Sequence, residues 1–151
     1  MPPRVTHERA ECPVARAVDV VGDRWLLLIV RDAFDGISRF SDFQRNLGLA
    51  KNILSSRLRE LVAQGILEVV PASDGSAYHE YALTRKGRDL FVLLVGLRQW
   101  GEDHLFEDDE PHSVLLDVRT QKPLQKLEAR DAAGRVLTST EAIVRKVQAT
   151  S

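Results

Sequence analysis

The fold of this chain is decided by residues 39–67, RFSDFQRNLGLAKNILSSRLRELVAQGIL. Ser41 can cap a helix that runs to Leu47, and Gly48 stops it. A second helix over residues 50–64 carries one apolar stripe, formed by Leu54, Leu58, Leu61 and Val62. Two short helices joined by a tight turn, the second with a polar outer face, are typical of a helix-turn-helix.

Two further helices are predicted on the N-terminal side of this stretch. Apolar residues recur at helical spacing over residues 13–21, where Pro13 suits the first turn. Asp23 can cap the next helix, residues 24–34, which is apolar on nearly every side and therefore belongs in the core.

A hairpin and a long helix are predicted on the C-terminal side. Residues 66–70 and 78–83 read as strands, and the sequence SDGS at 73–76 is a turn signal between them. Thr84 can cap a helix over residues 85–105. The complete order predicts an α+β fold, a winged helix-turn-helix domain closed by a long dimerisation helix.

The character of the chain changes after residue 106. Residues 107–111 form an acidic linker, and alternating apolar residues then flank a turn at 131–134. We expect two domains, a DNA-binding and dimerisation domain at 1–106 and a small β-rich extension at 111–151. Residues 142–147 could be the last strand of this extension or a short helix.

Composition limits the class of protein. The 151 residues carry a formal net charge of −1 and a single cysteine, and their apolar runs are too short for a membrane span. We therefore expect a cytoplasmic, soluble protein with no metal site and no cofactor. Within residues 37–59, five basic residues oppose one acidic residue, a local excess of four positive charges that is compatible with phosphate contacts.

The polar face of the helix at residues 50–64 is the candidate DNA-reading surface. A helix fits the major groove, where Asn pairs with adenine and Arg or Lys pairs with guanine. The expected base-reading residues are Lys51, Asn52, Ser55, Ser56 and Arg59. The expected contacts from the wing and to phosphates are Arg39, Ser73, Ser76, His79, Arg85 and Lys86.

Several motifs together resemble the HxlR-type family of winged-helix regulators, which are relatives of the MarR-type group. They are CPVARAVDVVGDRWLLLIVRDAF, the helix-turn-helix stretch, YHEYALTRKGRDL and LRQWGEDH, in that order between Cys12 and about Leu105. The resemblance implies a homodimer that binds a palindromic operator, usually as a repressor and sometimes as an activator. It also implies that the helix from Lys51 reads DNA and that the N-terminal and long C-terminal helices form the dimer.

The apolar surface of the long helix is larger than one core can bury, which also favours a dimer. The expected interface residues are Val14, Val18, Phe91, Leu94, Val95, Leu97 and Trp100. Some relatives carry cysteine pairs in a C-terminal extension, and this chain has none there.

Cys12 has two interpretations. It directly precedes Pro13 at a helix N-terminus, where backbone N–H groups and the helix dipole favour a thiolate. Resemblance to the family implies an electrophile or oxidant sensor at this position, whereas the simpler interpretation is a small residue packed near the dimer seam.

Two other functions compete with this interpretation. An enzyme is disfavoured because no nucleophile has a partner base at a recognisable spacing, and the four histidines are far apart in sequence. A winged helix can also be a protein-interaction module without specific DNA readout, but the basic, polar helix face argues for DNA.

Overall fold

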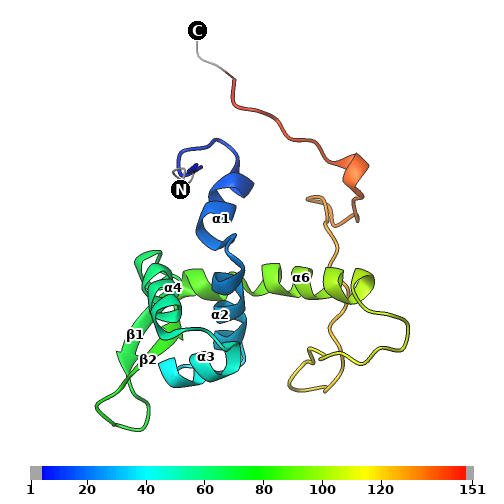
Figure 1. Ribbon diagram of the computed structural model, residues 1–151. Coiled ribbons are helices and arrows are strands. Elements are labelled where there is room, and N and C mark those ends of the chain that lie inside the picture. Colours follow the sequence, from blue (N-terminus) through cyan, green and yellow to red (C-terminus); the bar gives the residue numbers. More distant parts are fainter. Residues whose placement is uncertain (1–4, 149–151) are drawn as a thin grey trace. The chain divides into compact units, whose positions relative to one another are not determined.

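The computed structural model describes residues 5–148, which form two compact units, one ending at Phe91 and one beginning at Val92 (Figure 1). The first unit contains α1 (Pro13–Val21), α2 (Arg24–Phe34), α3 (Phe40–Leu47), α4 (Lys51–Ala63), β1 (Leu67–Pro71), β2 (His79–Leu83) and α5 (Arg85–Arg88). The second contains nearly all of α6 (Phe91–His104) and the 3₁₀ helix η1 (Ser139–Glu141). The predicted winged helix-turn-helix is confirmed.

The start of α2 follows from local side-chain chemistry. The Asp23 carboxylate accepts hydrogen bonds from the backbone N–H of Trp25 at 2.8 Å and of Leu26 at 3.3 Å. These amides have no partners within the helix, so the carboxylate satisfies them. Partial burial opposes ionisation, but the two amides and Arg57 together hold the pKa of Asp23 below its ordinary value.

The core of the first unit forms where α2, α3, α4 and the strands meet. Its fully buried large apolar side chains are Leu26, Ile29, Val30, Phe43, Leu54, Leu58, Leu61, Ile66 and Leu67. Phe43 also meets Tyr81 of β2 edge to face, with 6.4 Å between the ring centroids. This is a favourable arrangement for two aromatic rings. The apolar stripe predicted on α4 is therefore the side that holds the helix-turn-helix on the domain.

The wing is a two-stranded antiparallel sheet in which Leu67 pairs with Leu83 and Pro71 with His79. The backbone N–H of Tyr81 also donates to the Ser38 carbonyl at 2.8 Å, so the residues entering α3 lie against β2. This contact fixes the wing beside the helix-turn-helix.

The expected continuous helix over residues 85–105 is wrong. The structure divides it into α5 and α6, with Asp89 and Leu90 outside both helices. Within α5, Gly87 packs so closely that a Cβ there would lie 2.2 Å from the Ile66 carbonyl oxygen. The Leu90 N–H bonds back to the Gly87 carbonyl in a tight turn. The cap at Thr84 is confirmed, since its hydroxyl accepts from the Gly87 N–H at 3.1 Å. The expected cap at Ser41 is wrong: α3 starts two residues earlier than that cap would place it, at Phe40 with Arg39 as N-cap.

In the second unit, the tail is joined to α6 by polar contacts. The Gln99 side chain accepts from the Leu127 N–H at 2.7 Å and donates to the Gln125 carbonyl at 3.2 Å. Lys126 pairs with Asp103 at 2.7 Å. Val95, only 4% exposed, borders a small hollow of about 40 Å³ together with tail residues that include Val114, Leu115, Pro123 and Leu124.

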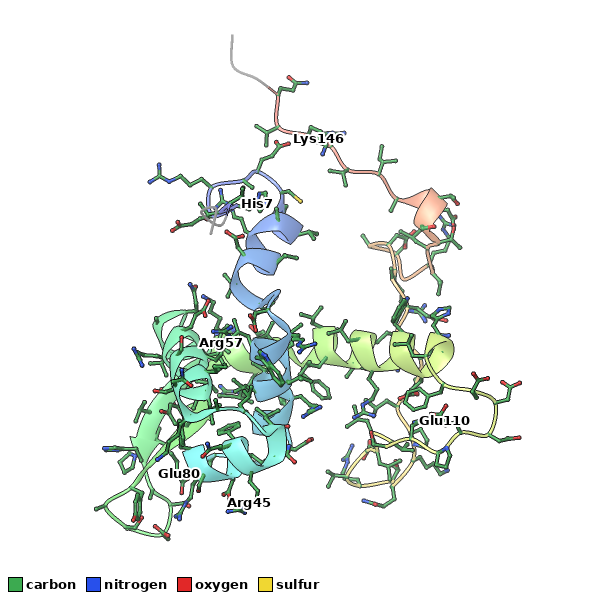
Figure 2. All side chains as sticks on the ribbon, viewed as in Figure 1. His7, Arg45, Arg57, Glu80, Glu110 and Lys146 are labelled. Carbon is green, nitrogen blue, oxygen red and sulfur yellow. The ribbon has the colours of Figure 1, made fainter. Side chains whose placement is uncertain are left out.

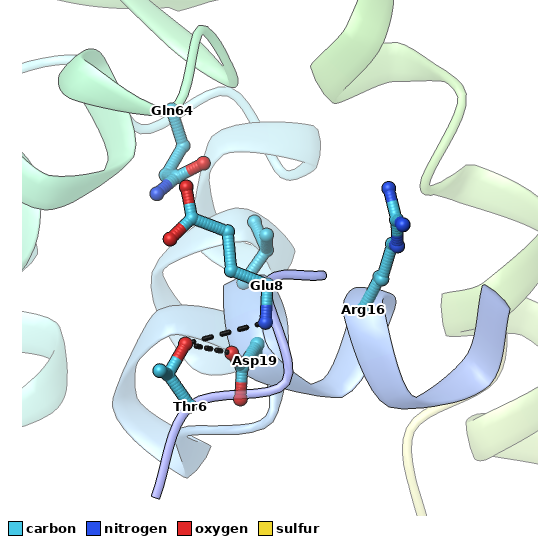
Figure 3. A pocket seen from close by; sticks show the side chains of 6 residues that line it. Thr6, Glu8, Arg16, Asp19 and Gln64 are labelled. Carbon is cyan, nitrogen blue, oxygen red and sulfur yellow. Dashed lines mark hydrogen bonds between the residues drawn. The ribbon is translucent and has the colours of Figure 1, made fainter. Parts of the chain in front are cut away.

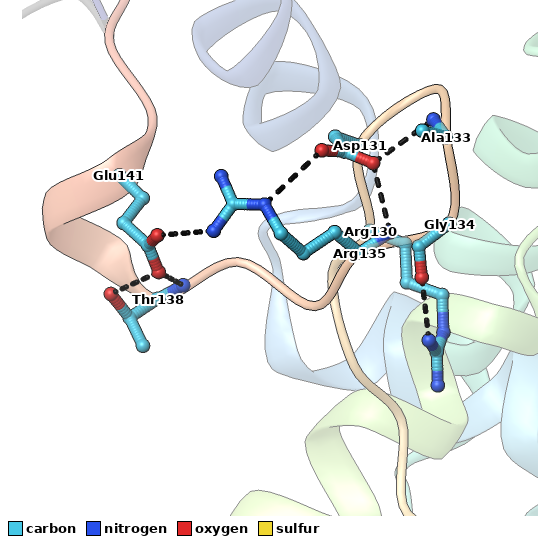
Figure 4. A network of polar contacts seen from close by, with 7 residues as sticks. All are labelled: Arg130, Asp131, Ala133, Gly134, Arg135, Thr138 and Glu141. Atoms are coloured by element: carbon cyan, nitrogen blue, oxygen red, sulfur yellow. Dashed lines mark hydrogen bonds and ion pairs between the residues drawn. The ribbon is translucent and has the colours of Figure 1, made fainter.

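The tail contains little regular structure within residues 105–148. It has two isolated antiparallel bridges, Leu116 with Pro123 and Arg130 with Val136, and residues 142–148 form neither a helix nor a strand. A β-rich extension is therefore unconfirmed. Local polar contacts still order it, as Figure 4 shows: Asp131 accepts from two backbone N–H groups of its turn, and Arg135 joins Asp131 to Glu141.

The domain division expected at residues 106–111 stays a prediction. The two compact units of the structure are divided at another place, between Phe91 and Val92 within α6. None of the helices in the described residues has the length and apolar character needed to span a membrane.

Candidate nucleic-acid interface

The turn between α3 and α4 sets the angle at which the second helix leaves the core. Gly48 caps α3 at φ 66°, and its N–H donates to the Gln44 carbonyl at 2.9 Å. This left-handed conformation suits glycine. Leu49 is buried, and Ala50 precedes the first residue of α4. Residues 48–50 thus form the tight turn that the sequence predicted.

The outer face of α4 presents four of the five expected base-reading side chains to solvent. Lys51, Asn52, Ser56 and Arg59 are exposed, whereas Ser55 is half-buried and receives a long hydrogen bond from Arg59 at 3.4 Å. The first turn of α4 contains no acidic residue and its N-cap makes no side-chain hydrogen bond. The N-terminal amides of α4 therefore remain suited to a phosphate.

Ion pairs within the chain neutralise much of the positive charge at residues 37–59. Arg45 pairs with Asp42 at 3.2 Å, and Arg57 pairs with Asp23 at 3.4 Å, which joins α4 to the start of α2. Arg39 pairs with both Asp74 and Glu80. Of the five cations at residues 37–59, the described part of the chain leaves only two without a carboxylate partner, Lys51 and Arg59.

Arg39 is the residue whose environment differs most from the expectation of a free phosphate contact. Its guanidinium joins the start of α3 to the wing turn at Asp74 and to β2 at Glu80 (Figure 2 labels Glu80). The hydrogen bond from Arg39, followed by those from Ser76, holds the pKa of Asp74 well below its ordinary value. The hydrogen bond from the Ser73 N–H lowers the pKa of Glu80 against the effect of its burial.

The other wing and phosphate candidates have different surroundings. Ser73 donates through its N–H and its hydroxyl to Glu80, both at 3.1 Å, and the Ser76 N–H donates to Asp74 at 2.9 Å, so these serines order the turn. His79 and Arg85 are exposed. Lys86 is exposed too, but its ammonium donates to the Gln64 carbonyl at 2.7 Å, at the end of α4.

Two exposed apolar side chains near this surface were missed from the sequence. Ile53 lies in the first turn of α4 and is exposed, and Tyr78 is 73% exposed where the wing turn returns to β2. An apolar side chain at the position of Ile53 could contact a thymine methyl group. Ile53 was missed because the sequence places it among leucines that are buried. For Tyr78 the sequence pattern predicts a strand residue, and an aromatic beside a glycine-containing turn is the signal that could have identified it.

The expected dimer residues differ in exposure. Val14 and Val18 on α1 are exposed, as are Phe91, Leu97 and Trp100 on α6. Leu94 is half-buried and Val95 is buried, so Val95 is not available to a partner. Val92 and Leu93 were not expected and add to the exposed apolar surface of α6.

Cys12 lies where the sequence placed it. It is the N-cap of α1, directly before Pro13 at the first helical position, and it is exposed. Its thiol is therefore accessible to a reagent in solution.

A helix-turn-helix with a polar, exposed second helix, followed by a two-stranded wing, defines the class of winged helix-turn-helix proteins. Within this class, the chain belongs to the HxlR-like helix-turn-helix family, whose sequence profile matches residues 20–109. That match covers more than half of the chain, including the whole candidate interface.

Individual relatives agree with this family. An HTH-type transcriptional regulator from Mycobacterium tuberculosis is 50% identical over 98 residues, 65% of this chain and 62% of that protein. The crystal structure of PA1607, described as a candidate transcription factor, is 50% identical, with a TM-score of 0.89 over 95% of this chain and all of that one. The oxidised form of the redox regulator HypR is 33% identical, with a TM-score of 0.56 over 62% of this chain and 97% of HypR.

These matches differ in whether they include the tail of the chain. The match to HypR spans 62% of the chain, whereas the similarity to PA1607 extends over 95% and therefore includes tail residues. The match spans just under two thirds of the length of the mycobacterial relative.

Proposed function

We propose that this chain is a DNA-binding transcriptional regulator that recognises a palindromic operator as a homodimer and acts as a repressor. The observation that carries the proposal is the outer face of α4, where Lys51, Asn52, Ser56 and Arg59 are exposed on a helix held by its opposite, buried face. Side chains with these groups near the N-terminus of a recognition helix can reach base edges in the major groove.

The relatives support the regulatory part of the proposal. The mycobacterial protein is named as an HTH-type transcriptional regulator, and HypR is described as a redox regulator. A regulator of this class would act on the chromosome in the cytoplasm, with double-stranded DNA as its partner. We propose no enzymatic activity for it.

The homodimer is supported by apolar residues exposed on two helices. Leu97 and Trp100 on α6 are 47% and 58% exposed, and Val14 and Val18 on α1 are 69% and 53% exposed. Exposed apolar surface that gathers into a patch marks a protein–protein interaction site. A two-fold dimer would also match the symmetry of a palindromic site, with recognition helices about one helical turn of DNA apart, roughly 34–36 Å.

Selection of genomic DNA fragments by the purified protein, followed by gel shift on the selected sequence, tests the proposal. We expect a specific complex that an unrelated fragment does not compete away, with an affinity that falls as salt rises. If no specific binding occurs even at low salt, the protein-interaction module without DNA readout becomes the better interpretation.

The sign of regulation needs a separate measurement. Transcription from a promoter that contains the selected site should fall when the protein is added. A rise in transcription would show an activator and overturn the repressor assignment, while leaving DNA recognition intact.

A further inference from the structure

A hollow of about 280 Å³ lies between α1 and the residues that follow α4, within the first unit. We call it the α1 hollow. Its apolar wall consists of Ala17, Val20, Val21, Ile66 and Leu90, of which Val21 and Ile66 are buried and form the floor. An apolar wall with few polar groups is the usual character of a small-molecule site, and this volume is just below the usual range of such sites, which suits a small ligand.

Two cations complete the α1 hollow, Arg16 and Lys86, and both are exposed. Within residues 5–148, neither has a carboxylate within ion-pair distance. Each is instead anchored by a backbone carbonyl: Arg16 Nε donates to Ala10, and Lys86 Nζ donates to Gln64. A guanidinium has five donors and an ammonium three, so most of their hydrogen-bonding capacity is still available to an anion.

A second hollow that is also lined by Arg16 limits the charge of that anion. It shares Arg16 and Val20 with the α1 hollow, but its lining adds the carboxylates of Glu8 and Asp19 (Figure 3). Asp19 is fixed there by the Thr6 hydroxyl at 2.9 Å and the His7 N–H at 2.6 Å. A ligand with a second negative charge beyond Arg16 would face these two acidic groups and be repelled.

We propose that the α1 hollow binds a small hydrophobic monocarboxylate, such as a benzoate with a short alkyl group. Its apolar body lies against Val21, Ile66 and Leu90, and its carboxylate bonds to Arg16 and Lys86. The floor supplies burial of apolar surface, and the cations supply charge-assisted hydrogen bonds that a neutral analogue cannot form fully.

Occupancy of the α1 hollow would affect DNA binding, a step that rests on the proposed function. One wall belongs to α1, whose neighbouring face carries Val14 and Val18, and the other contains Ile66, three residues beyond the end of α4. A ligand between them would fix the orientation of α1 relative to the recognition helix. Because operator binding depends on the separation of the two recognition helices, a bound carboxylate should change operator affinity.

Isothermal titration of the full chain without DNA tests the binding step. The probes are para-isopropylbenzoate, its neutral amide, and isopropylphthalate, which adds a second carboxylate. We expect the amide and the phthalate each to bind about tenfold more weakly than the benzoate, or worse. Ala17→Leu, at an exposed helical position, should fill the hollow and abolish binding without loss of thermal stability.

Charge variants identify the cations. Arg16→Gln and Lys86→Gln should each weaken benzoate binding about tenfold, and Arg16→Lys should restore part of it. Arg88→Gln is the matched control, because Arg88 lies on the same short helix as Lys86 but outside the hollow.

Several results would overturn the proposal. The binding site would be disproved if titration with millimolar benzoate released or absorbed no heat. Equal affinity for the benzoate and its amide, or equal effects of Lys86→Gln and Arg88→Gln on benzoate affinity, would disprove it too. Equal affinity for the phthalate would overturn the restriction to one charge.

A gel shift with and without benzoate then separates ligand binding from its effect on DNA binding. Unchanged operator affinity would overturn only the regulatory step, whereas benzoate binding by a protein that binds no DNA would overturn the proposed function and leave the ligand site standing.

Discussion

The Asn46 side-chain amide donates a 2.8 Å hydrogen bond to the carboxylate of Asp32, which is completely buried in α2. Asp32 also receives two hydrogen bonds from Arg31, at 2.8 and 3.0 Å. A buried carboxylate is costly unless it is paired and hydrogen-bonded, and here one of its partners comes from α3. The first helix of the helix-turn-helix is thereby fixed to the central helix of the domain.

Asn46→Ala should therefore destabilise the fold, because it leaves a buried carboxylate oxygen without its partner. We expect a loss of about 1–3 kcal/mol in the free energy of unfolding, measured by urea denaturation. Asn52→Ala is the matched control, since Asn52 is exposed on α4 and should leave stability unchanged. Equal stability of the two variants would show that the Asn46 contact contributes nothing.

Substitution of a residue predicted to contact bases should change DNA binding differently from substitution of a residue predicted to contact phosphates. Arg59→Ala and Asn52→Ala should each cost on the order of 1–3 kcal/mol of operator binding and relax sequence preference. Arg85→Ala should weaken specific and non-specific DNA alike and lower the dependence of affinity on salt. Gel shifts with operator and scrambled DNA give both quantities. If all three variants lose both kinds of binding in equal proportion, α4 is not the reading helix.

Neutralising Asp74 should remove one of the two carboxylates that hold Arg39, while Glu80 remains. In Asp74→Asn the wing loses a negative charge that would face phosphates, so non-specific DNA affinity should rise and become more salt-dependent. Stability should respond to pH as well. The pKa of Asp74 is depressed in the folded state, below the ordinary value of 3.8. Its stabilisation is therefore present above that ordinary value and is lost as pH falls below it.

Denaturation curves collected from about pH 5 downward should thus lose stability more gently in Asp74→Asn than in the wild type. Parallel curves would contradict a stabilising pair between Arg39 and Asp74. Unchanged affinity for non-specific DNA would show that Arg39 does not reach phosphates even without its pair to Asp74.

The parts of the fold that sequence predicted correctly depend on neighbours in the chain. The Asp23 and Thr84 caps bond to amides two or three residues away, and Gly48 ends α3 by its own conformation. Hydrophobic periodicity located the buried stripe of α4 for the same reason, because one helix contains the whole signal.

The parts that were missed depend on residues distant in sequence. The close packing of Gly87 in α5 against the Ile66 carbonyl has no signal in the residues around it, and one partner of Arg39 lies 35 residues away at Asp74. Val95 is buried beside tail residues that show no regular pattern, so nothing in its own helix distinguished it from Leu97.

The two apolar faces of α6 can be separated by substitution. Leu97→Asp should produce monomers by light scattering while the chain stays folded, because Leu97 is exposed and a charge there disrupts only a partner contact. Val95→Ala should keep the dimer but cost about 2 kcal/mol of stability, since it creates a cavity next to the tail. A Leu97→Asp protein that remains dimeric at micromolar concentration would place the interface elsewhere.

Cys12 should act as a switch if its position at the start of α1 is used for sensing. The thiol is exposed at the N-cap, two residues before the exposed Val14, so an adduct or oxidised form there would lie close to the expected dimer contact. With one cysteine per chain, reversible oxidation requires a sulfenic acid, a mixed disulfide with a small thiol, or a bond between subunits. Each of these would shift α1 and with it the spacing of the two recognition helices, so operator affinity should fall.

Treatment of the wild type and Cys12→Ser with diamide and with a quinone, followed by operator gel shift, measures this effect. Both reagents should lower the operator affinity of the wild type, and dithiothreitol should restore it after diamide treatment. Cys12→Ser should not respond to either reagent. Mass spectrometry of the treated protein identifies which adduct forms, and non-reducing electrophoresis detects a bond between subunits. If both proteins respond equally, or neither responds, Cys12 is a packing residue, and any effector must act at another site such as the α1 hollow.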